Sequence, residues 1–203
     1  MDVQQMLDEY EVRRVRQVWA FARDHGEWDT MRACFHPDAT VCVAWYSGPV
    51  STFLERTIAM AAERAPEHRS KHWFGNSRVA VKGDRAILET DAMVMNRDRL
   101  EGKLVDFTIY LRLYDRMERR GGQWKILRMD GIYDKDRIDP VIPGSLPLSW
   151  FDGLRLAGPS SAVGLMRWRA EKRGGKVSSD IALAGPESER KLRAAAEAWL
   201  AGG

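Results

Sequence analysis

The sequence has few cysteines and no long apolar run. Only Cys34 and Cys42 occur in 203 residues, too few for a disulfide framework or a four-cysteine zinc site. The opening residues, MDVQQMLDEYEVRRV, lack the basic start and apolar stretch of a secretory signal, and no segment approaches the roughly 18 consecutive apolar residues typical of a membrane span. We therefore expect a soluble cytoplasmic protein without a membrane partner.

Neither sign of charge dominates, and long low-complexity tracts are missing. Lys and Arg number 32 against 29 Asp and Glu, which gives a formal net charge of +3 that is spread along the chain. A nucleic-acid-binding domain would gather its basic residues on one face, so we expect no nucleic-acid partner. With 44% hydrophobic residues, the composition favours one compact domain with a short appendage.

Motifs that bind metals or phosphates are also missing. His25, His36 and His68 occur without HxH or HExxH spacing, and no cysteine pair stands beside them. The glycine-containing segments fit neither the GxGxxG nor the GxxxxGK[ST] pattern. We therefore expect no metal and no other cofactor.

Hydrophobic periodicity predicts helices at the start of the chain. Residues 3–24 carry apolar side chains at helical spacing, namely Val12, Val15, Val18, Trp19 and Ala22. Gly26 suits a left-handed helix cap, and residues 27–35 favour a short second helix that ends before Pro37. The chain therefore begins with a helical hairpin.

A strand and a third helix are expected next. Residues 40–46, TVCVAWY, are rich in β-branched and aromatic types, and residues 47–49 predict a turn. The Ala-rich segment 51–65 has Ser51 as a candidate N-cap and Pro66 just beyond its end, which is typical of a helix.

From residue 68 onward the pattern becomes that of strands. Four runs, 68–81, 85–96, 103–118 and 123–134, are joined by turn signals at 82–84, 97–102 and 121–122. The short links predict an antiparallel meander. In the third run, one face is apolar and the other carries Tyr110, Arg112 and Tyr114. We expect a sheet with one apolar side.

The last part of the chain differs in composition. Residues 140–203 are rich in Pro, Gly and Ser at first and end in a helix predicted over 186–200. This segment is too short and polar to own a core. We therefore predict a main domain over residues 1–139 and an extension, 140–203, that packs on it or on a neighbouring subunit.

The order of these elements resembles the nuclear transport factor 2-like superfamily, and in particular its SnoaL-like members. The segments ARDHGEWDTMRACFHPDATV, SKHWFGNSRVAV and LYDRMERRGGQWKI are similar to recurring segments of that superfamily. The resemblance implies an α+β fold, a cone in which a curved, mostly antiparallel sheet packs on N-terminal helices and encloses a mostly apolar pocket. A helical C-terminal extension would be added to it.

The resemblance also implies a catalytic pair. Scytalone dehydratase and hexachlorocyclohexane dehydrochlorinase, two enzymes of the superfamily, use an Asp and a His that face each other across the pocket. Matching residues 27–29 and 71–75 to their segments places Asp24 and His72 at these positions. An imidazole titrates near neutrality and can accept a proton, while a carboxylate orients it. The alternatives are a helix-end carboxylate at Asp24 and a structural strand histidine at His72.

Other positions are expected to contact a substrate. Asn96 stands where scytalone dehydratase has a second pocket histidine, and the alternative is a residue at the end of a strand that opens a turn. Arg23 replaces the tyrosine of that enzyme, which argues against the scytalone reaction itself. Arg128 matches a pocket arginine of several SnoaL-like proteins and could stabilise negative charge, or could pair with Asp130 instead. Four aromatic residues are candidates for the pocket wall or for the core, namely Trp45, Tyr46, Trp73 and Phe74.

The sequence therefore predicts a cofactor-independent lyase or isomerase that acts on a small hydrophobic, cyclic substrate. Two alternatives stay open: a non-catalytic module that binds a small ligand, and a small structural subunit of a ring-hydroxylating dioxygenase. Relatives form dimers or trimers, so we also expect a homo-oligomer, with the face of Tyr110, Arg112 and Tyr114 as a contact surface.

Overall fold

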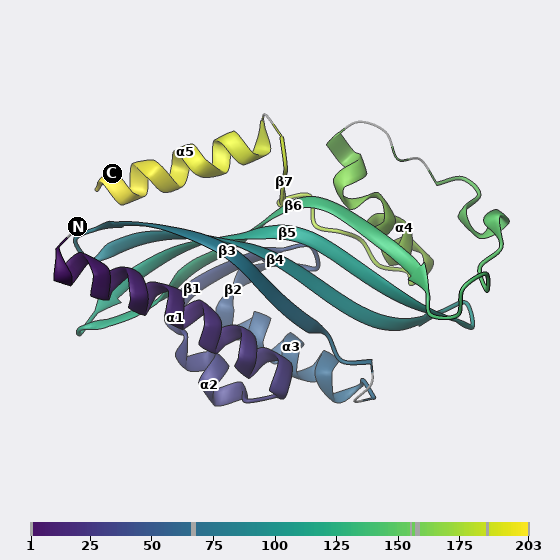
Figure 1. Cartoon of the computed structure of the whole chain (residues 1–203), viewed down its shortest axis with the longest axis horizontal. Coiled ribbons are helices and arrows are strands. Elements are labelled where there is room, and N and C mark those ends of the chain that lie inside the picture. The colour runs from purple at the N-terminus through teal and green to yellow at the C-terminus, as the bar shows by residue number, and fades with distance from the viewer. Residues whose placement is uncertain (1, 66–67, 155, 157–158, 186, 203) are drawn as a thin grey trace.

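A curved sheet with helices on both faces organises the chain (Figure 1). The structure is a computed structural model that describes residues 2–65, 68–154, 156, 159–185 and 187–202. Within these residues the strands form one sheet in the order β2-β1-β6-β5-β4-β3, and β7 pairs with β6. The predicted α+β class with a nuclear transport factor 2-like arrangement is confirmed.

The strands are β1 (Phe35–Val43), β2 (Tyr46–Pro49), β3 (Lys71–Lys82), β4 (Arg85–Leu100), β5 (Lys103–Arg120), β6 (Gln123–Pro140) and β7 (Ala182–Leu183). The helices are α1 (Val3–His25), α2 (Trp28–Ala33), α3 (Val50–Ala62), α4 (Gly164–Lys172) and α5 (Ser188–Ala201). Two 3-10 turns, η2 (Leu148–Phe151) and η3 (Pro159–Val163), precede α4.

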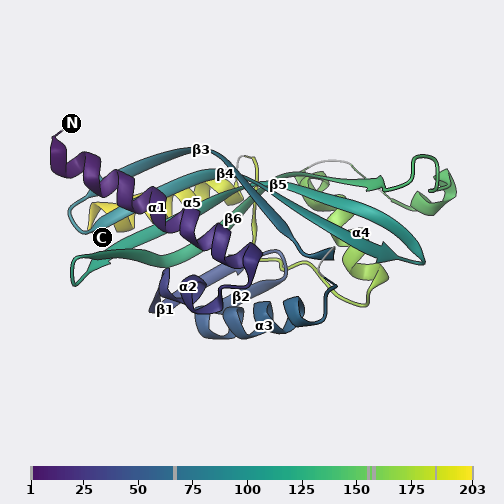
Figure 2. The ribbon, with the colours of Figure 1, turned by 60° about the horizontal axis from the view of Figure 1, so that its bottom comes forward.

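Strands β3 to β6 form the predicted antiparallel meander, and β1 lies parallel to β6. The first three helices gather on one face of this sheet, while α5 lies on the other (Figures 1 and 2). The N-terminus of α1 and helix α4 lie toward opposite ends of the long axis (Figure 2).

Helix α1 carries the first site residue. The Asp2 side chain accepts a hydrogen bond from the Gln5 amide at the start of the helix. Gly26, with φ of 75°, ends it in the left-handed conformation that glycine adopts without strain. A buried stripe that includes Trp19 and Ala22 packs against the sheet, so the end of α1 is held beside β3.

The first strand and the third helix begin earlier than the sequence predicts. Strand β1 starts at Phe35, and the pairing with β6 is irregular between Phe35 and Thr40, which accommodates Pro37. Residues 47–49, predicted as a turn, pair with β1 together with Tyr46 as strand β2. Helix α3 begins at Val50 after Pro49, and no side chain caps it, so the N-cap role predicted for Ser51 is wrong.

The turn predicted over residues 97–102 is much shorter in the structure. Strand β4 continues to Leu100, and the ion pair between Arg97 and Asp106 joins β4 to β5 across the ladder. Only Glu101 and Gly102 form the turn, with φ of 48° and 78°. Both strands are therefore long enough to reach beyond the main core.

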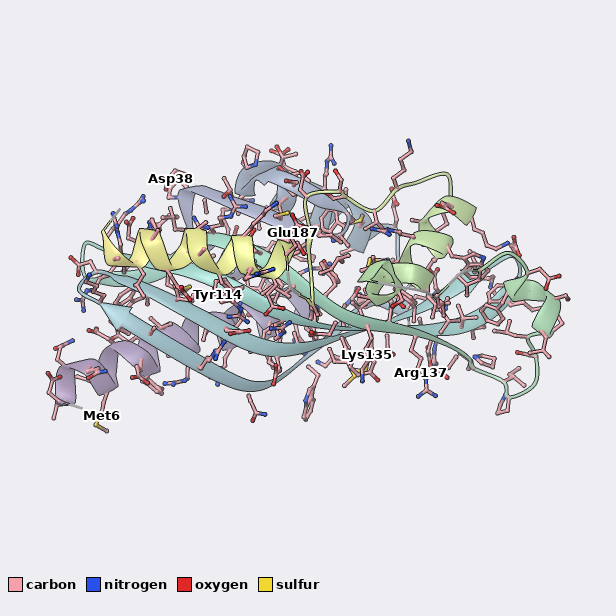
Figure 3. All side chains as sticks on the ribbon, turned by 90° about the horizontal axis from the view of Figure 1, so that it is seen from above. Met6, Asp38, Tyr114, Lys135, Arg137 and Glu187 are labelled. Carbon is pink, nitrogen blue, oxygen red and sulfur yellow. The ribbon has the colours of Figure 1, made fainter. Side chains whose placement is uncertain are left out.

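The outer face of the sheet is not left open. Helix α5 lies across it with Tyr114 beneath the helix (Figure 3). A second cluster of buried apolar side chains joins the strands to the extension, formed by Ile87, Tyr114, Ile132, Ala182 and Ala196. The prediction that only one side of the sheet is apolar is therefore wrong, because the extension supplies the cover.

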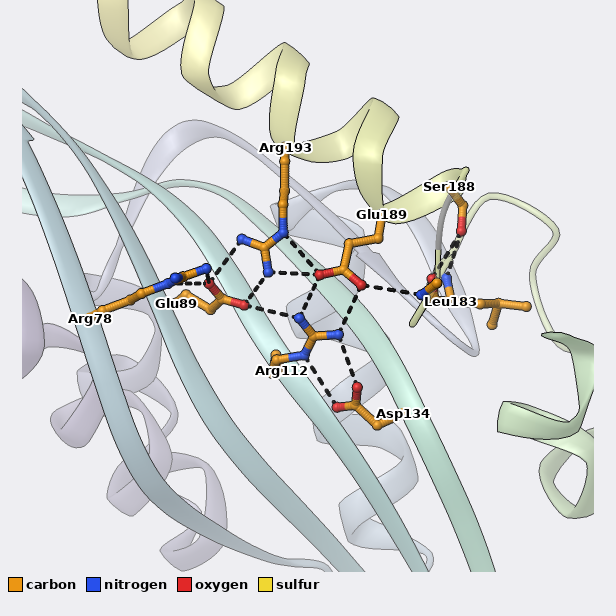
Figure 4. A network of polar contacts seen from close by, with 9 residues as sticks. Arg78, Glu89, Arg112, Asp134, Leu183, Ser188, Glu189 and Arg193 are labelled. Atoms are coloured by element: carbon orange, nitrogen blue, oxygen red, sulfur yellow. Dashed lines mark hydrogen bonds and ion pairs between the residues drawn. The ribbon is translucent and has the colours of Figure 1, made fainter.

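A network of ion pairs also joins α5 to the strands (Figure 4). Glu89 of β4 pairs with Arg78 of β3, Arg112 of β5 and Arg193 of α5, and its side chain is only 7% exposed. Glu189 of α5 pairs with the same Arg112 and Arg193. Arg112 and Tyr114, predicted as part of an oligomer contact, thus bind α5 of the same chain.

Among the described helices, none is both long enough and apolar enough to span a bilayer.

Candidate functional site

A cavity of about 580 Å³ lies between the sheet and the helices that cover its inner face. Much of its wall is hydrocarbon from four strands and from helix α4, including Val43, Val94, Ile109, Leu111, Met129 and Met166. The end of α1 and the segment that follows α3 supply polar groups. A cavity of this size and composition suits a small, largely apolar molecule held by a few polar contacts.

Asp24 and His72 meet at the wall of this cavity. His72 Nδ1 lies 2.6 Å from Asp24 Oδ1, and the His72 backbone N–H donates to Asp24 Oδ2 over 2.9 Å. The Asp24 side chain is only 4% exposed, and the His72 side chain is 10% exposed. Lys71 Nζ lies 3.4 Å from Asp24 Oδ2 on the solvent side. One carboxylate therefore fixes both the backbone and the ring of His72.

This geometry defines the protonation of the pair. Burial lowers the pKa of His72 below its usual value, although the hydrogen bond that His72 donates to Asp24 opposes the shift. Burial would raise the pKa of Asp24, but the hydrogen bonds from His72 outweigh it and hold that pKa below its usual value. The pair is therefore a carboxylate and a neutral imidazole at neutral pH. Nδ1 carries the proton, and Nε2 keeps a free lone pair.

Aromatic side chains hold the imidazole in place. The Trp19 ring meets His72 edge-on, with centroids 5.6 Å apart and an interplanar angle of 81°. Phe74 stacks beside Trp19 at 6.3 Å, and the Arg16 guanidinium lies 4.7 Å from the Trp19 centroid. Rotation of the ring would require this packed set to move.

Asn96 also lines the cavity, as the sequence predicts. It lies within β4 and is buried, so the alternative of a residue that opens a turn is wrong. Its Oδ1 accepts hydrogen bonds from Ser70 Oγ at 2.6 Å and from Arg64 Nη1 at 3.2 Å. Because a guanidinium only donates, this orientation of the amide is fixed. The Nδ2 group is left as a donor beside the cavity.

Arg128 does not reach the cavity. It lies on β6 next to Met129, whose side chain lines the wall, and successive side chains on a strand point to opposite faces. Its guanidinium makes two hydrogen bonds to Asp130, at 2.7 and 2.9 Å. The arrangement is the ion pair that the sequence left as the alternative to a substrate contact.

The four aromatic candidates lie in different environments in the structure. Trp45 lines the cavity and stacks on Phe53 at 5.2 Å. Tyr46 is buried and donates to the Pro49 carbonyl at 2.7 Å, while Trp73 is 63% exposed on the alternate face of β3. Phe74 packs behind Trp19. Of the four, only Trp45 is among the residues that line the cavity in the described structure.

Two groups of lining residues were missed at the sequence level. Arg23 and Arg64 bring guanidinium groups to the polar side, and Met166, Arg169 and Arg173 bring the extension into the wall. The position of Arg23 directly before Asp24 could have indicated that Arg23 lines the cavity. For the extension, no sequence signal existed, because the salt bridges from Arg169 and Arg173 to Asp98 join distant parts of the chain.

Comparisons with known proteins agree with the fold. A sequence model of the SnoaL-like domain matches residues 4–130. Pea pathogenicity protein 2 of Fusarium vanettenii is 27% identical over 205 residues, which cover 97% of this chain and 87% of that protein.

Two solved structures share the fold. A candidate scytalone dehydratase from Novosphingobium aromaticivorans superposes with a TM-score of 0.59 and 14% identity, covering 72% of this chain and 99% of that one. A hexachlorocyclohexane dehydrochlorinase of type 2 superposes with a TM-score of 0.55 and 15% identity, covering 73% and 99%. The matched residues 4–130 make up more than half of the sequence, and the chain belongs to the SnoaL-like family of the nuclear transport factor 2-like superfamily.

Proposed function

We propose that the protein is a cofactor-independent lyase or isomerase that transfers a proton on a small hydrophobic, cyclic substrate. His72 Nε2 is the general base. Asp24 holds the proton on Nδ1 and stabilises the imidazolium that forms when Nε2 accepts the substrate proton. Asn96 Nδ2 is placed to donate a hydrogen bond to the oxygen on which negative charge develops.

The observation that carries this proposal is the hydrogen bond between His72 Nδ1 and Asp24 at 2.6 Å, beside a largely apolar cavity. A dry wall strengthens the attraction between a carboxylate and an imidazolium, so the pair suits proton abstraction from carbon. A pure binding module would not require a buried base of this kind.

Two observations count against the alternative of a structural subunit. Such a subunit would fill its cavity and keep the outer sheet face for a catalytic partner. Here the cavity has a volume of about 580 Å³, and α5 covers part of the outer face.

Proton abstraction can be tested before the substrate is known. We would incubate the protein in deuterated water with a panel of cyclic ketones, such as cyclohexanone, indanone and tetralone, and follow deuterium uptake at the α-carbon by mass spectrometry. We expect uptake above the buffer rate for at least one ketone. We expect His72→Gln to abolish it, because Gln has no basic nitrogen.

His68→Gln is the matched control, since His68 lies outside the residues that line the cavity. It should exchange at the wild-type rate. Uptake that continues in His72→Gln at the wild-type rate would refute the assignment of His72 as the base.

A further inference from the structure

Among the residues that line the cavity, cationic side chains outnumber carboxylates. Six of these residues carry Lys or Arg side chains, namely Arg23, Arg64, Arg69, Arg169, Arg173 and Lys176, whereas Asp24 is the one carboxylate among the described lining residues. Asp98, which is not among the lining residues, pairs with both Arg169 and Arg173 and offsets one of their two charges. The remaining cations give the cavity wall a net positive charge that Asp24 balances only in part.

Arg23 is the most informative of these cations. It lies in the last turn of α1, directly before Asp24, and it is half-buried. Within the described part of the chain, its guanidinium makes no hydrogen bond and lies within 4.0 Å of no carboxylate. Burial lowers the pKa of Arg23 to about 10, and Asp24 opposes the shift without forming an ion pair. A half-buried guanidinium that has no acceptor among the described residues can take a carboxylate of a ligand as its partner.

Arg64 stands close enough to Arg23 to lower its pKa further. It uses Nη1 for both of its hydrogen bonds, to Ser70 Oγ and Asn96 Oδ1, and both acceptors are neutral. The other nitrogens of this guanidinium have no partner among the described residues. Two guanidiniums with unused donors therefore lie on the side of the cavity that also holds His72.

The remaining wall of the cavity is apolar. Ile109, Leu111 and Met129 of the sheet and Met166 of α4 present only hydrocarbon or thioether groups. A ligand that satisfies both sides has an apolar ring and one planar anion. Guanidinium groups match a carboxylate in shape and charge, because two parallel N–H donors meet its two oxygens.

We propose that the cavity binds a hydrophobic carboxylic acid in its anionic form, with the carboxylate on Arg23 and Arg64 and the apolar body against the strands. The inference rests on the proposed function, because it names the substrate class of the same site. It separates two tasks: the arginines bind and orient the acid, and His72 transfers the proton.

A matched pair of small molecules tests this directly. Naphthylacetate and naphthylacetamide share size and shape but differ in charge, so isothermal titration of both into the full chain isolates the contribution of the anion. We expect the acid to bind at least about tenfold more tightly than the amide, the value of one charge-assisted contact. Equal affinity for the two, or no detectable binding of the acid up to its solubility limit, would overturn the proposal.

Variants place the effect on Arg23. Arg23→Gln should weaken binding of naphthylacetate by about tenfold and leave naphthylacetamide unchanged, and Arg23→Lys should restore part of the loss. Arg137→Gln is the control, because it removes the same charge from an exposed side chain that is not among the described residues lining the cavity. An acid-to-amide ratio that stays at the wild-type value in Arg23→Gln would contradict the assignment.

A second measurement, the melting temperature, distinguishes a loss of binding from misfolding of the variant. Because Arg23 makes no hydrogen bond or ion pair among the described residues, its replacement removes no such contact, and Arg23→Gln should melt at about the wild-type temperature in the absence of ligand. A melting temperature well below that of the wild type would instead identify Arg23 as a structural residue and count against the proposal.

The same titration in His72→Gln separates the two hypotheses. We expect this variant to keep the preference for the acid while it loses deuterium exchange. If exchange proves independent of His72 but the acid preference holds, the proposed function fails alone. If acid and amide bind equally while exchange depends on His72, the substrate class fails alone.

Discussion

At the scale of single residues, the tautomer of His72 depends on how Asp24 divides its two oxygens. One oxygen accepts from the His72 backbone N–H, which is always a donor, and the other accepts from Nδ1. Only a group that accepts at both positions leaves Nε2 free to take a proton. The chemistry of the site therefore depends on a carboxylate and not simply on a polar side chain.

Asp24→Asn should consequently reduce activity by more than the loss of one negative charge alone would do, because it also changes the tautomer of His72. Its oxygen must face the backbone N–H, so the amide NH2 turns toward Nδ1 and forces the ring proton onto Nε2. We expect the rate of α-deuterium uptake to fall by about two to four orders of magnitude. A rate within a factor of two of the wild type would show that the tautomer does not limit the reaction.

The pH dependence of stability follows from the same pair. The pKa of His72 is lower in the folded protein than in the unfolded chain because of burial, so the unfolded chain takes up this proton first. Above about pH 6.5 His72 is neutral in both states and costs the folded protein no stability. As the pH falls from there toward the folded pKa, the free energy of unfolding decreases, in total by about 1.4 kcal/mol for each unit by which the folded and unfolded pKa values differ. Asp24 adds a further loss at lower pH, below about 4.

Urea unfolding between pH 7 and pH 5 measures this effect. The wild type should lose more stability over that range than His72→Gln, because the variant lacks the titrating group. Identical slopes for the two proteins would contradict the pKa shift of His72.

Residue-level prediction from the sequence had a clear limit. Asp24, His72 and Asn96 could be assigned to the cavity because they were matched to positions of the family. Trp45 was one of four aromatic candidates, and the sequence did not separate it from the other three. Arg128 could not be placed correctly, since the choice between a pocket contact and the pair with Asp130 depends on which face of β6 it occupies. That face follows from the register with β1 and β5, which local patterns do not encode.

At the scale of elements, α5 stabilises the sheet from its outer face. Glu89 lies at the centre of its contact, nearly buried and paired with arginines from β3, β5 and α5. The hydrogen bonds from Arg193 and Arg78 hold the pKa of Glu89 below its usual value, against the opposing effect of burial. The helix is therefore tied to three elements through one carboxylate.

Glu89→Gln should destabilise the protein by about 2 kcal/mol, because it leaves several guanidinium groups without their shared acceptor. Urea unfolding measures this loss. Glu187→Gln is the matched control, since its ion pair with Lys191 is almost fully exposed, and it should change stability by less than about 0.5 kcal/mol. A Glu89→Gln loss as small as that of the control would show that Glu89 does not stabilise the contact between α5 and the sheet.

The elements themselves were predictable where the hydrophobic period was strong. The four long strands and helix α1 follow directly from their spacing of apolar residues. The start of β1, strand β2 and the cover of the outer face were not predictable, because each depends on pairing or packing with a distant segment. Tyr114 illustrates this: alternation correctly put it on the polar face, but α5 buries it there.

At the scale of the whole molecule, the fold brings together groups that the sequence separates. Asp24 and His72 are 48 residues apart, and the cavity wall continues into the extension at Met166. The sheet supplies the apolar wall, the helical layer supplies the carboxylate, and the segment after α3 supplies Arg64. The site is a product of the complete chain, including its extension.

The protonation of His72 in the intact protein tests the central claim most directly. Nitrogen-15 NMR of the labelled imidazoles, with the His72 signals assigned by their loss in His72→Gln, distinguishes the two neutral tautomers from the imidazolium. At pH 7 we predict a neutral ring with its proton on Nδ1 and an unprotonated Nε2. A proton on Nε2, or a fully protonated ring at that pH, would contradict the account.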